Sequence, residues 1–148
     1  MVRRIIHEGH SIGSHSDTHP EPWTVPMPSL VREYHRGRAH VERAAHQPAP
    51  LFRPPKGYVD WKGATAMLAA RLQPWLWTVD PHDWMPDVRP ADILAGLTGL
   101  RGGDVVLLHD AIEGPLAPSA LDRSATVAVL GAVDALAAER GLRFTTLR

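Results

Sequence analysis

Residues 105–110 read Val-Val-Leu-Leu-His-Asp, and this stretch decides the fold class. Four apolar residues in succession are typical of a short strand that is buried on both faces. Such strands occur in parallel sheets, where helices cover the two faces and functional groups gather at the carboxyl ends of the strands. We therefore expect helices before and after this strand, and a functional role for His109 at its end.

The rest of the chain repeats the same alternation of short apolar strands and amphipathic helices. Further strands are expected at Ile12, 51–52, 75–79 and 143–147. Helices are expected at 2–8, 29–45 with Ser29 as N-cap, 60–72, 90–100 and 119–140. Gly9 and Gly141 stand where a helix can stop in a left-handed conformation.

This order of elements predicts parallel strands that are joined by right-handed helical crossovers. The fold class is therefore α/β, either an open sheet or an incomplete barrel. At 148 residues the chain fits a single domain, because a polypeptide of this size gains little burial by splitting.

Composition excludes several function classes. Sixteen basic residues balance sixteen acidic ones, so no net charge favours nucleic acid as a partner. The absence of cysteine excludes a disulfide framework, a thiolate zinc site and a cysteine nucleophile. No apolar stretch approaches the ~20 residues that a membrane-spanning helix needs. The sequence leaves the oligomeric state open.

Polar side chains follow four of the expected strands directly. They are His15 and His19 after Ile12, Arg53 after Phe52, the segment 80–84 after Val79, and His109 with Asp110 after Leu108. Because the carboxyl ends of parallel strands lie at one edge of a sheet, we expect these groups to form one site.

The pair His15 and His19 has a spacing that allows two imidazoles to face one metal ion. The chain holds nine histidines, however, so such a pair also arises by chance. From spacing alone, the pair is as consistent with two histidines in a surface loop as with a metal site.

Four segments resemble, in order, the second to fifth motifs of the polysaccharide deacetylase family, also called the NodB homology family or carbohydrate esterase family 4. They read Gly-His-Ser-Ile-Gly-Ser-His-Ser-Asp-Thr-His-Pro (9–20), Leu-Phe-Arg-Pro-Pro-Lys-Gly (51–57), Trp-Thr-Val-Asp-Pro-His-Asp-Trp (77–84) and Val-Val-Leu-Leu-His-Asp (105–110). The resemblance implies a distorted (β/α) barrel, here incomplete. It also implies hydrolysis of the N-acetyl amide or O-acetyl ester of a polysaccharide or amino sugar.

The resemblance assigns His15 and His19 as ligands of a divalent metal, usually zinc, together with an aspartate from a first motif of the type Thr-Phe-Asp-Asp-Gly-Pro. Two histidines and a carboxylate leave one coordination position open on the metal. Zinc in such a site polarises a carbonyl and lowers the pKa of bound water toward about 7.

The resemblance also assigns the proton donor and its partner. His109 matches the general acid that protonates the departing amine, a role that suits imidazole because it changes charge near neutral pH. Asp83 matches the carboxylate that orients this histidine. The alternatives are a strand-end histidine that bonds a neighbouring loop, and an ordinary loop aspartate.

The remaining assignments concern the substrate. Trp84 and Leu107 resemble the apolar walls of the acetate pocket, although both are ordinary core residues in other contexts. Arg53 resembles the arginine that pairs with the catalytic-base aspartate, and the backbone N–H of Lys56 falls at an oxyanion-binding position. The alternative for this segment is a rigid, proline-rich surface turn.

The chain departs from the family pattern in its first motif, because no Asp-Asp dipeptide occurs in its 148 residues. We therefore expect a truncated domain with impaired activity, in which Arg53 lacks its usual partner. Asp17 is the nearest carboxylate that could replace the third metal ligand.

Two alternatives stay open. The chain could be a catalytically inactive remnant that binds glycan or metal, or a hydrolase of the same superfamily that acts on a small amide. Localisation depends on an upstream export signal: with one, the protein is extracellular or in the cell envelope, and without one it is cytoplasmic.

Overall fold

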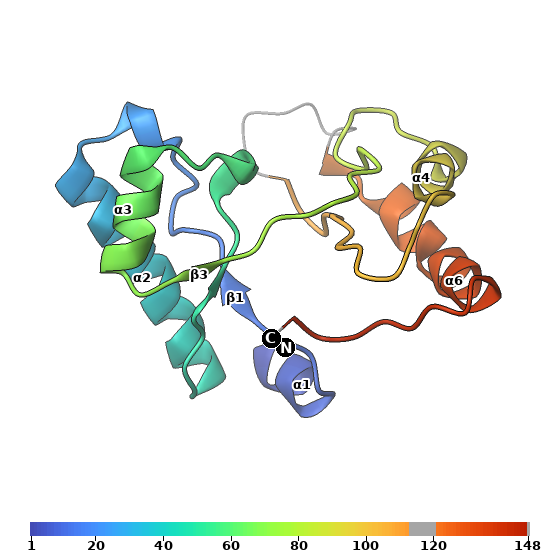
Figure 1. The fold of residues 1–148 in the computed structure, drawn as a ribbon, viewed down its shortest axis with the longest axis horizontal. Helices are drawn as coiled ribbons and strands as arrows, with labels where there is room; N and C mark the ends of the chain where they lie inside the picture. Colours follow the sequence, from blue (N-terminus) through green and yellow to red (C-terminus); the bar gives the residue numbers. More distant parts are fainter. Residues whose placement is uncertain (113–120, 148) are drawn as a thin grey trace. The chain divides into compact units, whose positions relative to one another are not determined.

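The computed structural model describes residues 1–112 and 121–147 (Figure 1). Their contacts divide the chain into two compact units. The first comprises Met1–Leu76 with the last residues from Thr146 onward, and the second comprises Trp77–Thr145. Each unit has a hydrophobic core of its own. The expectation of a single domain is not tested by this division and stays a prediction.

The first unit alternates helices with short parallel strands. Its elements are α1 (Val2–His7), β1 (Gly13–Ser14), η1 (Pro22–Thr24), α2 (Met27–Ala45), β2 (Leu51–Phe52), η2 (Pro55–Gly57), α3 (Trp61–Ala69) and β3 (Gln73–Pro74). The strands form a parallel sheet in the order β1-β2-β3. The expected parallel arrangement is therefore confirmed for these strands. Ser14 pairs with Phe52, so the residues that follow both strands emerge at the same edge.

Helix α2 begins at Met27, two residues before the expected start at Ser29. Pro26 occupies the N-cap and a further proline lies in the first turn, where a missing N–H costs nothing. The Ser29 hydroxyl accepts a hydrogen bond from Arg32 instead of capping the helix. At the other end, His46 adopts a left-handed conformation and ends the helix after Ala45, as expected.

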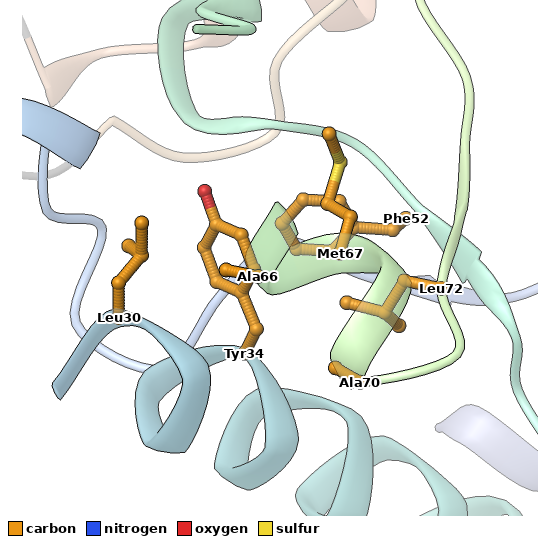
Figure 2. Close-up of a cluster of buried hydrophobic side chains, with 7 residues drawn as sticks. All are labelled: Leu30, Tyr34, Phe52, Ala66, Met67, Ala70 and Leu72. Carbon is orange, nitrogen blue, oxygen red and sulfur yellow. The ribbon is translucent and has the colours of Figure 1, made fainter. Parts of the chain in front are cut away.

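The core of the first unit lies between α2, α3 and β2, as Figure 2 shows. Its buried members are Leu30, Tyr34, Phe52, Ala66, Met67, Ala70 and Leu72. The rings of Tyr34 and Phe52 contact each other with centroids 4.6 Å apart. Burial of an aromatic or leucine side chain contributes about 1.5–3 kcal/mol, so these contacts hold α2 against the sheet and fix the loop that precedes it.

The second unit is built on the helices α4 (Pro90–Leu97) and α6 (Ser124–Glu139). Ile93 and Leu97 of α4 pack against Val129 and Val133 of α6 and are buried. Val79 and Val106 form an isolated parallel bridge next to this core. The segment 105–108, which the apolar pattern predicts to be a strand, therefore lies beside Val79. Among the described residues, its strand pairing is limited to this one bridge.

Several expected boundaries are wrong. The third strand pairs at Gln73–Pro74 rather than across 75–79. The backbone N–H groups of Gln73 and Trp75 donate to the carbonyl oxygens of Pro50 and Phe52, and these bonds place the pairing here. The segment 143–147 has no ladder partner among the described residues and is not a strand there. The expected helix start at Ser119 lies outside the described residues. None of the described helices is long and apolar enough to span a bilayer.

Candidate active site

The loop after β1 carries the histidine pair. The rings of His15 and His19 lie with centroids 4.8 Å apart at an interplanar angle of 74°. His15 follows β1 directly, and its Nδ1 lies 2.6 Å from the carbonyl oxygen of Arg53, which follows β2. The strand register thus brings His15 and Arg53 together. One short loop carries both imidazoles, and their role as metal ligands stays a prediction.

A carboxylate of helix α2 binds the backbone of this loop. Glu33 accepts hydrogen bonds from the backbone N–H of Asp17, at 2.9 Å, and from that of Thr18. Within the loop, the backbone N–H of His19 donates to the Ser16 hydroxyl at 2.9 Å. Ser16 and His19 both have positive φ, a conformation that costs non-glycine residues energy. These bonds offset that cost and fix the turn between the two histidines.

Asp17 does not serve as the substitute metal ligand. Its carboxylate lies 3.0 Å from the guanidinium of Arg36 and 2.9 Å from Nδ1 of His40, and only 10% of its side chain is exposed. Both partners belong to α2. The carboxylate therefore ties the loop to the helix, and the expectation that Asp17 replaces the missing ligand is wrong.

The histidine pair fits part of a zinc site. Metal-bound histidines commonly donate their second ring N–H to a carbonyl, as the contact of His15 with Arg53 allows, and such a ring binds metal through Nε2. No group of three His, Asp or Glu side chains in 1–112 and 121–147 is arranged to hold a metal ion. The pair can supply two donors, and a catalytic zinc site has three protein ligands and one open position.

Arg53 and Lys56 occupy the turn that follows β2. Burial lowers the pKa of the Arg53 guanidinium below its usual value, and no side chain among the described residues forms an ion pair with it. Lys56 has φ 53°, so the proline-rich segment makes a sharp turn at this residue. Its ammonium forms an exposed ion pair with Glu21, which raises the pKa of Lys56.

In the second unit, Asp83 and His109 form a hydrogen-bonded carboxylate–imidazole pair. Oδ1 of Asp83 lies 2.8 Å from Nδ1 of His109, and Oδ2 accepts the His109 backbone N–H at 2.8 Å. The Asp83 side chain is completely buried, whereas 27% of the His109 side chain is exposed. A carboxylate only accepts hydrogen bonds, so Nδ1 carries the proton and Nε2 is the nitrogen that exchanges protons.

Two residues that sequence reasoning missed complete this arrangement. The Thr126 hydroxyl donates to Oδ2 of Asp83 at 2.9 Å, and Arg123 donates to the backbone oxygen of Asp83 at 2.5 Å. Both lie at the start of α6 and are buried. Local spacing gives no signal for them, because they follow Asp83 by 40 and 43 residues.

The residues assigned to the acetate pocket differ in burial. Leu107 is buried, and Trp84 has 42% of its surface exposed. The Trp84 indole lies 3.3 Å from the carboxylate of Asp80, which also accepts the backbone N–H of His82. Asp80 therefore shapes the turn that presents Asp83 and Trp84.

The structure collects the expected site residues into two sets. The first unit holds His15, His19, Arg53 and Lys56, and the second holds Asp83, Trp84, Leu107 and His109. Within each set the backbone brings the side chains of separate motifs together. That the two sets form one catalytic centre stays a prediction.

Similarity to known proteins identifies the family. The sequence profile described as polysaccharide deacetylase matches residues 1–74. This chain belongs to the polysaccharide deacetylase family. The family assignment made from the four motifs is therefore confirmed.

Two curated deacetylases are similar to most of the chain. A peptidoglycan-N-acetylglucosamine deacetylase of Bacillus cereus is 30% identical over 99% of this chain and 66% of its own length. A chitooligosaccharide deacetylase of Rhizobium leguminosarum bv. trifolii is 30% identical over 74% of this chain and 51% of its own length. The chain therefore spans less than two thirds of the length of these relatives.

A solved structure supports the fold class. The family 4 carbohydrate esterase from Streptomyces lividans, solved in complex with acetate, matches with a TM-score of 0.81 and 25% identity. The match covers 95% of this chain and 67% of the esterase. The NodB-type α/β fold class is confirmed by this likeness, and the described strands of either unit do not close a barrel.

Proposed function

We propose that this chain acts in the metal-dependent removal of acetyl groups from a polysaccharide or amino sugar. The bond that is hydrolysed is the N-acetyl amide or an O-acetyl ester. The observation that carries the proposal is the pair of hydrogen bonds between Asp83 and His109, at 2.8 Å each. The activities for which both curated relatives are named, deacetylation of peptidoglycan N-acetylglucosamine and of chitooligosaccharides, support the same reaction class.

His109 is the proposed proton donor. Cleavage of the amide requires that the departing nitrogen leaves as an amine, so a proton must reach it as the C–N bond breaks. With Nδ1 bonded to Asp83, a protonated ring donates from Nε2. The buried carboxylate keeps the ring in one orientation and stabilises its positive charge, as in other carboxylate–histidine pairs.

The first unit is proposed to bind the metal and the acetyl group. His15 and His19 would hold the ion, which supplies polarisation of the carbonyl and an activated water when bound. The backbone N–H of Lys56 is the proposed donor to the developing oxyanion. Trp84 and Leu107 of the second unit are proposed to contact the acetyl methyl group.

Turnover by this chain is proposed to be slow. No carboxylate among the described residues joins the histidine pair, and Asp17 is committed to Arg36 and His40. A positioned general base contributes typically 10²–10⁴-fold to the rate, so its absence leaves the reaction to the metal, the oxyanion donor and His109.

Acetate release from N-acetylated chito-oligosaccharides and from peptidoglycan fragments tests the proposal. The purified chain is loaded with Zn²⁺ or Co²⁺, and a chelated sample is the control. We expect slow release that stops when the metal is removed. Release at the same rate in the chelated sample would contradict metal dependence.

A second function, glycan binding without hydrolysis, is favoured by one observation, the lack of a third metal-binding side chain among the described residues. Calorimetric titration with the same oligosaccharides separates the two functions. Binding without any acetate release supports the binding function, whereas binding with metal-dependent release supports the deacetylase.

A further inference from the structure

Asp83 is a buried carboxylate whose two oxygens have different partners. Oδ1 bonds only the ring of His109 among the contacts that the structure describes. Oδ2 accepts two hydrogen bonds, from the His109 backbone N–H at 2.8 Å and from the Thr126 hydroxyl at 2.9 Å. The two donors on Oδ2 leave Oδ1 directed at the ring.

The donors on Oδ2 are held in place by their own surroundings. Thr126 lies in the first turn of α6 and is only 6% exposed. Threonine in a helix divides between two side-chain rotamers, and the hydrogen bond to Asp83 selects one of them. Farther along the same helix, Val129 and Val133 are buried against α4. The hydroxyl is therefore fixed by the core of the second unit.

Arg123 fixes the backbone of the same aspartate. Its guanidinium donates to the carbonyl oxygen of Asp83 at 2.5 Å, and the residue is only 8% exposed. This places a positive charge beside a residue whose side chain is a buried negative charge.

We propose that Thr126 and Arg123 are positioning residues that set the tautomer of His109 through Asp83. Thr126 holds Oδ2, Arg123 holds the backbone carbonyl, and together they direct Oδ1 at Nδ1 of the ring. The proton on a neutral His109 then resides on Nδ1, and Nε2 is left as the exchanging nitrogen. The catalytic meaning of this inference rests on the proposed role of His109 as proton donor.

A loss of the Thr126 hydroxyl has a defined consequence. Oδ2 would keep only the backbone N–H of His109, and the carboxylate could turn about its side-chain bond. A carboxylate that turns away from the ring makes a weaker hydrogen bond with Nδ1, so a neutral His109 would carry its proton on Nε2 more often. Because the effect concerns the position of one proton, it differs from a general loss of packing.

The test compares Thr126→Val with Thr126→Ser in the full chain. Valine keeps the shape of threonine and removes the hydroxyl, and serine keeps the hydroxyl. Thr98→Val is the matched control, because Thr98 is exposed at the end of α4 and bonds Ala95. The readout is the tautomer of neutral His109, from the ¹⁵N chemical shifts of its ring, which needs no substrate or metal.

We expect the Nδ1–H tautomer in the wild type, in Thr126→Ser and in Thr98→Val. In Thr126→Val, the ratio of the tautomers should shift about tenfold toward Nε2–H, because a weaker hydrogen bond between Nδ1 and the Asp83 carboxylate loses part of what a hydrogen bond to a charged group contributes. An unchanged tautomer in folded Thr126→Val would overturn the proposal. Because no turnover is measured, this result is independent of whether the chain is a deacetylase.

A measurement on the wild type covers the case in which Thr126→Val does not fold. A hydroxyl proton bonded to a buried carboxylate exchanges slowly with water and gives its own proton signal. We expect this signal for Thr126, with a nuclear Overhauser effect to the backbone N–H of His109, which bonds the same oxygen. A rapidly exchanging Thr126 hydroxyl would overturn the proposal.

Discussion

The backbone of Gly37 in α2 lies against the carbonyl of Ser16, so closely that a Cβ on Gly37 would stand 2.4 Å from the Ser16 oxygen. This contact explains a glycine in the middle of a 19-residue helix, where glycine is otherwise unfavourable. The loop that carries His15 and His19 rests on the helix at this point, next to the bonds from Glu33. Gly37 thus belongs to the support of the loop that carries the histidine pair.

Gly37→Ala is expected to destabilise the chain, although alanine in a helix interior usually stabilises by roughly 0.5–1 kcal/mol. The new Cβ would meet backbone atoms of Ser16, which cannot move without shifting the histidine loop. Gly131→Ala is the control, because nothing lies within 4 Å of a Cβ there, in the middle of α6. Urea unfolding should show opposite signs for the two variants. Stabilisation by both would contradict the account.

Zinc affinity should fall by at least 10- to 100-fold in His15→Ala and in His19→Ala, because changes even outside the direct ligands cost that much. His35→Ala is the control, since His35 is an exposed histidine on α2 that lies outside the loop. Isothermal titration with Zn²⁺ measures the affinities. Zinc affinity equal to that of the wild type in all three variants would show that the pair does not hold the metal.

Lys56→Ala and Lys56→Gly should each leave acetate release within about threefold of the wild type. The proposed donor is the backbone N–H, which both variants keep, and the ion pair with Glu21 is exposed and contributes little. Glycine also tolerates the positive φ of this position better than alanine does. A large loss of rate in both variants would indicate that the ammonium itself takes part.

Tyr34→Phe should leave the free energy of unfolding at neutral pH unchanged or raise it by up to ~1 kcal/mol. The Tyr34 hydroxyl is buried and bonds no other described group, and Figure 2 shows it at the end of a ring that packs among α2, α3 and β2. A buried hydroxyl without a hydrogen bond costs free energy, which phenylalanine avoids. Tyr58→Phe, at an exposed tyrosine, is the control.

The same variant should alter alkaline stability. Burial, and then the charges of Asp60 and Glu33, raise the pKa of Tyr34 from 10.0 to about 12. Because folding raises the pKa of Tyr34, its protonated hydroxyl contributes to the free energy of unfolding. This contribution is fully present below pH 10 and is lost as the pH rises toward 12. Tyr34→Phe should therefore lose less stability between pH 10 and pH 12 than the wild type. Equal losses of stability in the wild type and in Tyr34→Phe would contradict the burial of the Tyr34 hydroxyl.

The sequence was sufficient to predict local structure where one short motif contains both a strand and the polar residues that follow it. Phe52 and Leu108 end apolar stretches, and the residues directly after them, Arg53 and His109, contact His15 and Asp83. Parallel pairing also followed from the pattern, because helices separate the strands. The roles of these site residues stay predictions.

The sequence was insufficient where long-range contacts decide the structure. The bonds of Thr126 and Arg123 to Asp83 cross 43 and 40 residues, which no local pattern can encode. The third strand pairs at Gln73–Pro74 because of its contacts with β2, although the apolar pattern favoured the residues after it. The glycine at position 37 is likewise explained by a long-range contact, because its backbone lies against Ser16 in a distant loop.

The most direct test of the central claim is the rate of acetate release from N-acetylated chito-oligosaccharide by the zinc-loaded chain and by its His109→Ala variant. Loss of a general acid costs typically 10²–10⁴-fold, so the variant should release no more acetate than the metal-free chain. His7→Ala, at an exposed histidine of α1, should match the wild type. Equal rates in wild type and His109→Ala would contradict the account.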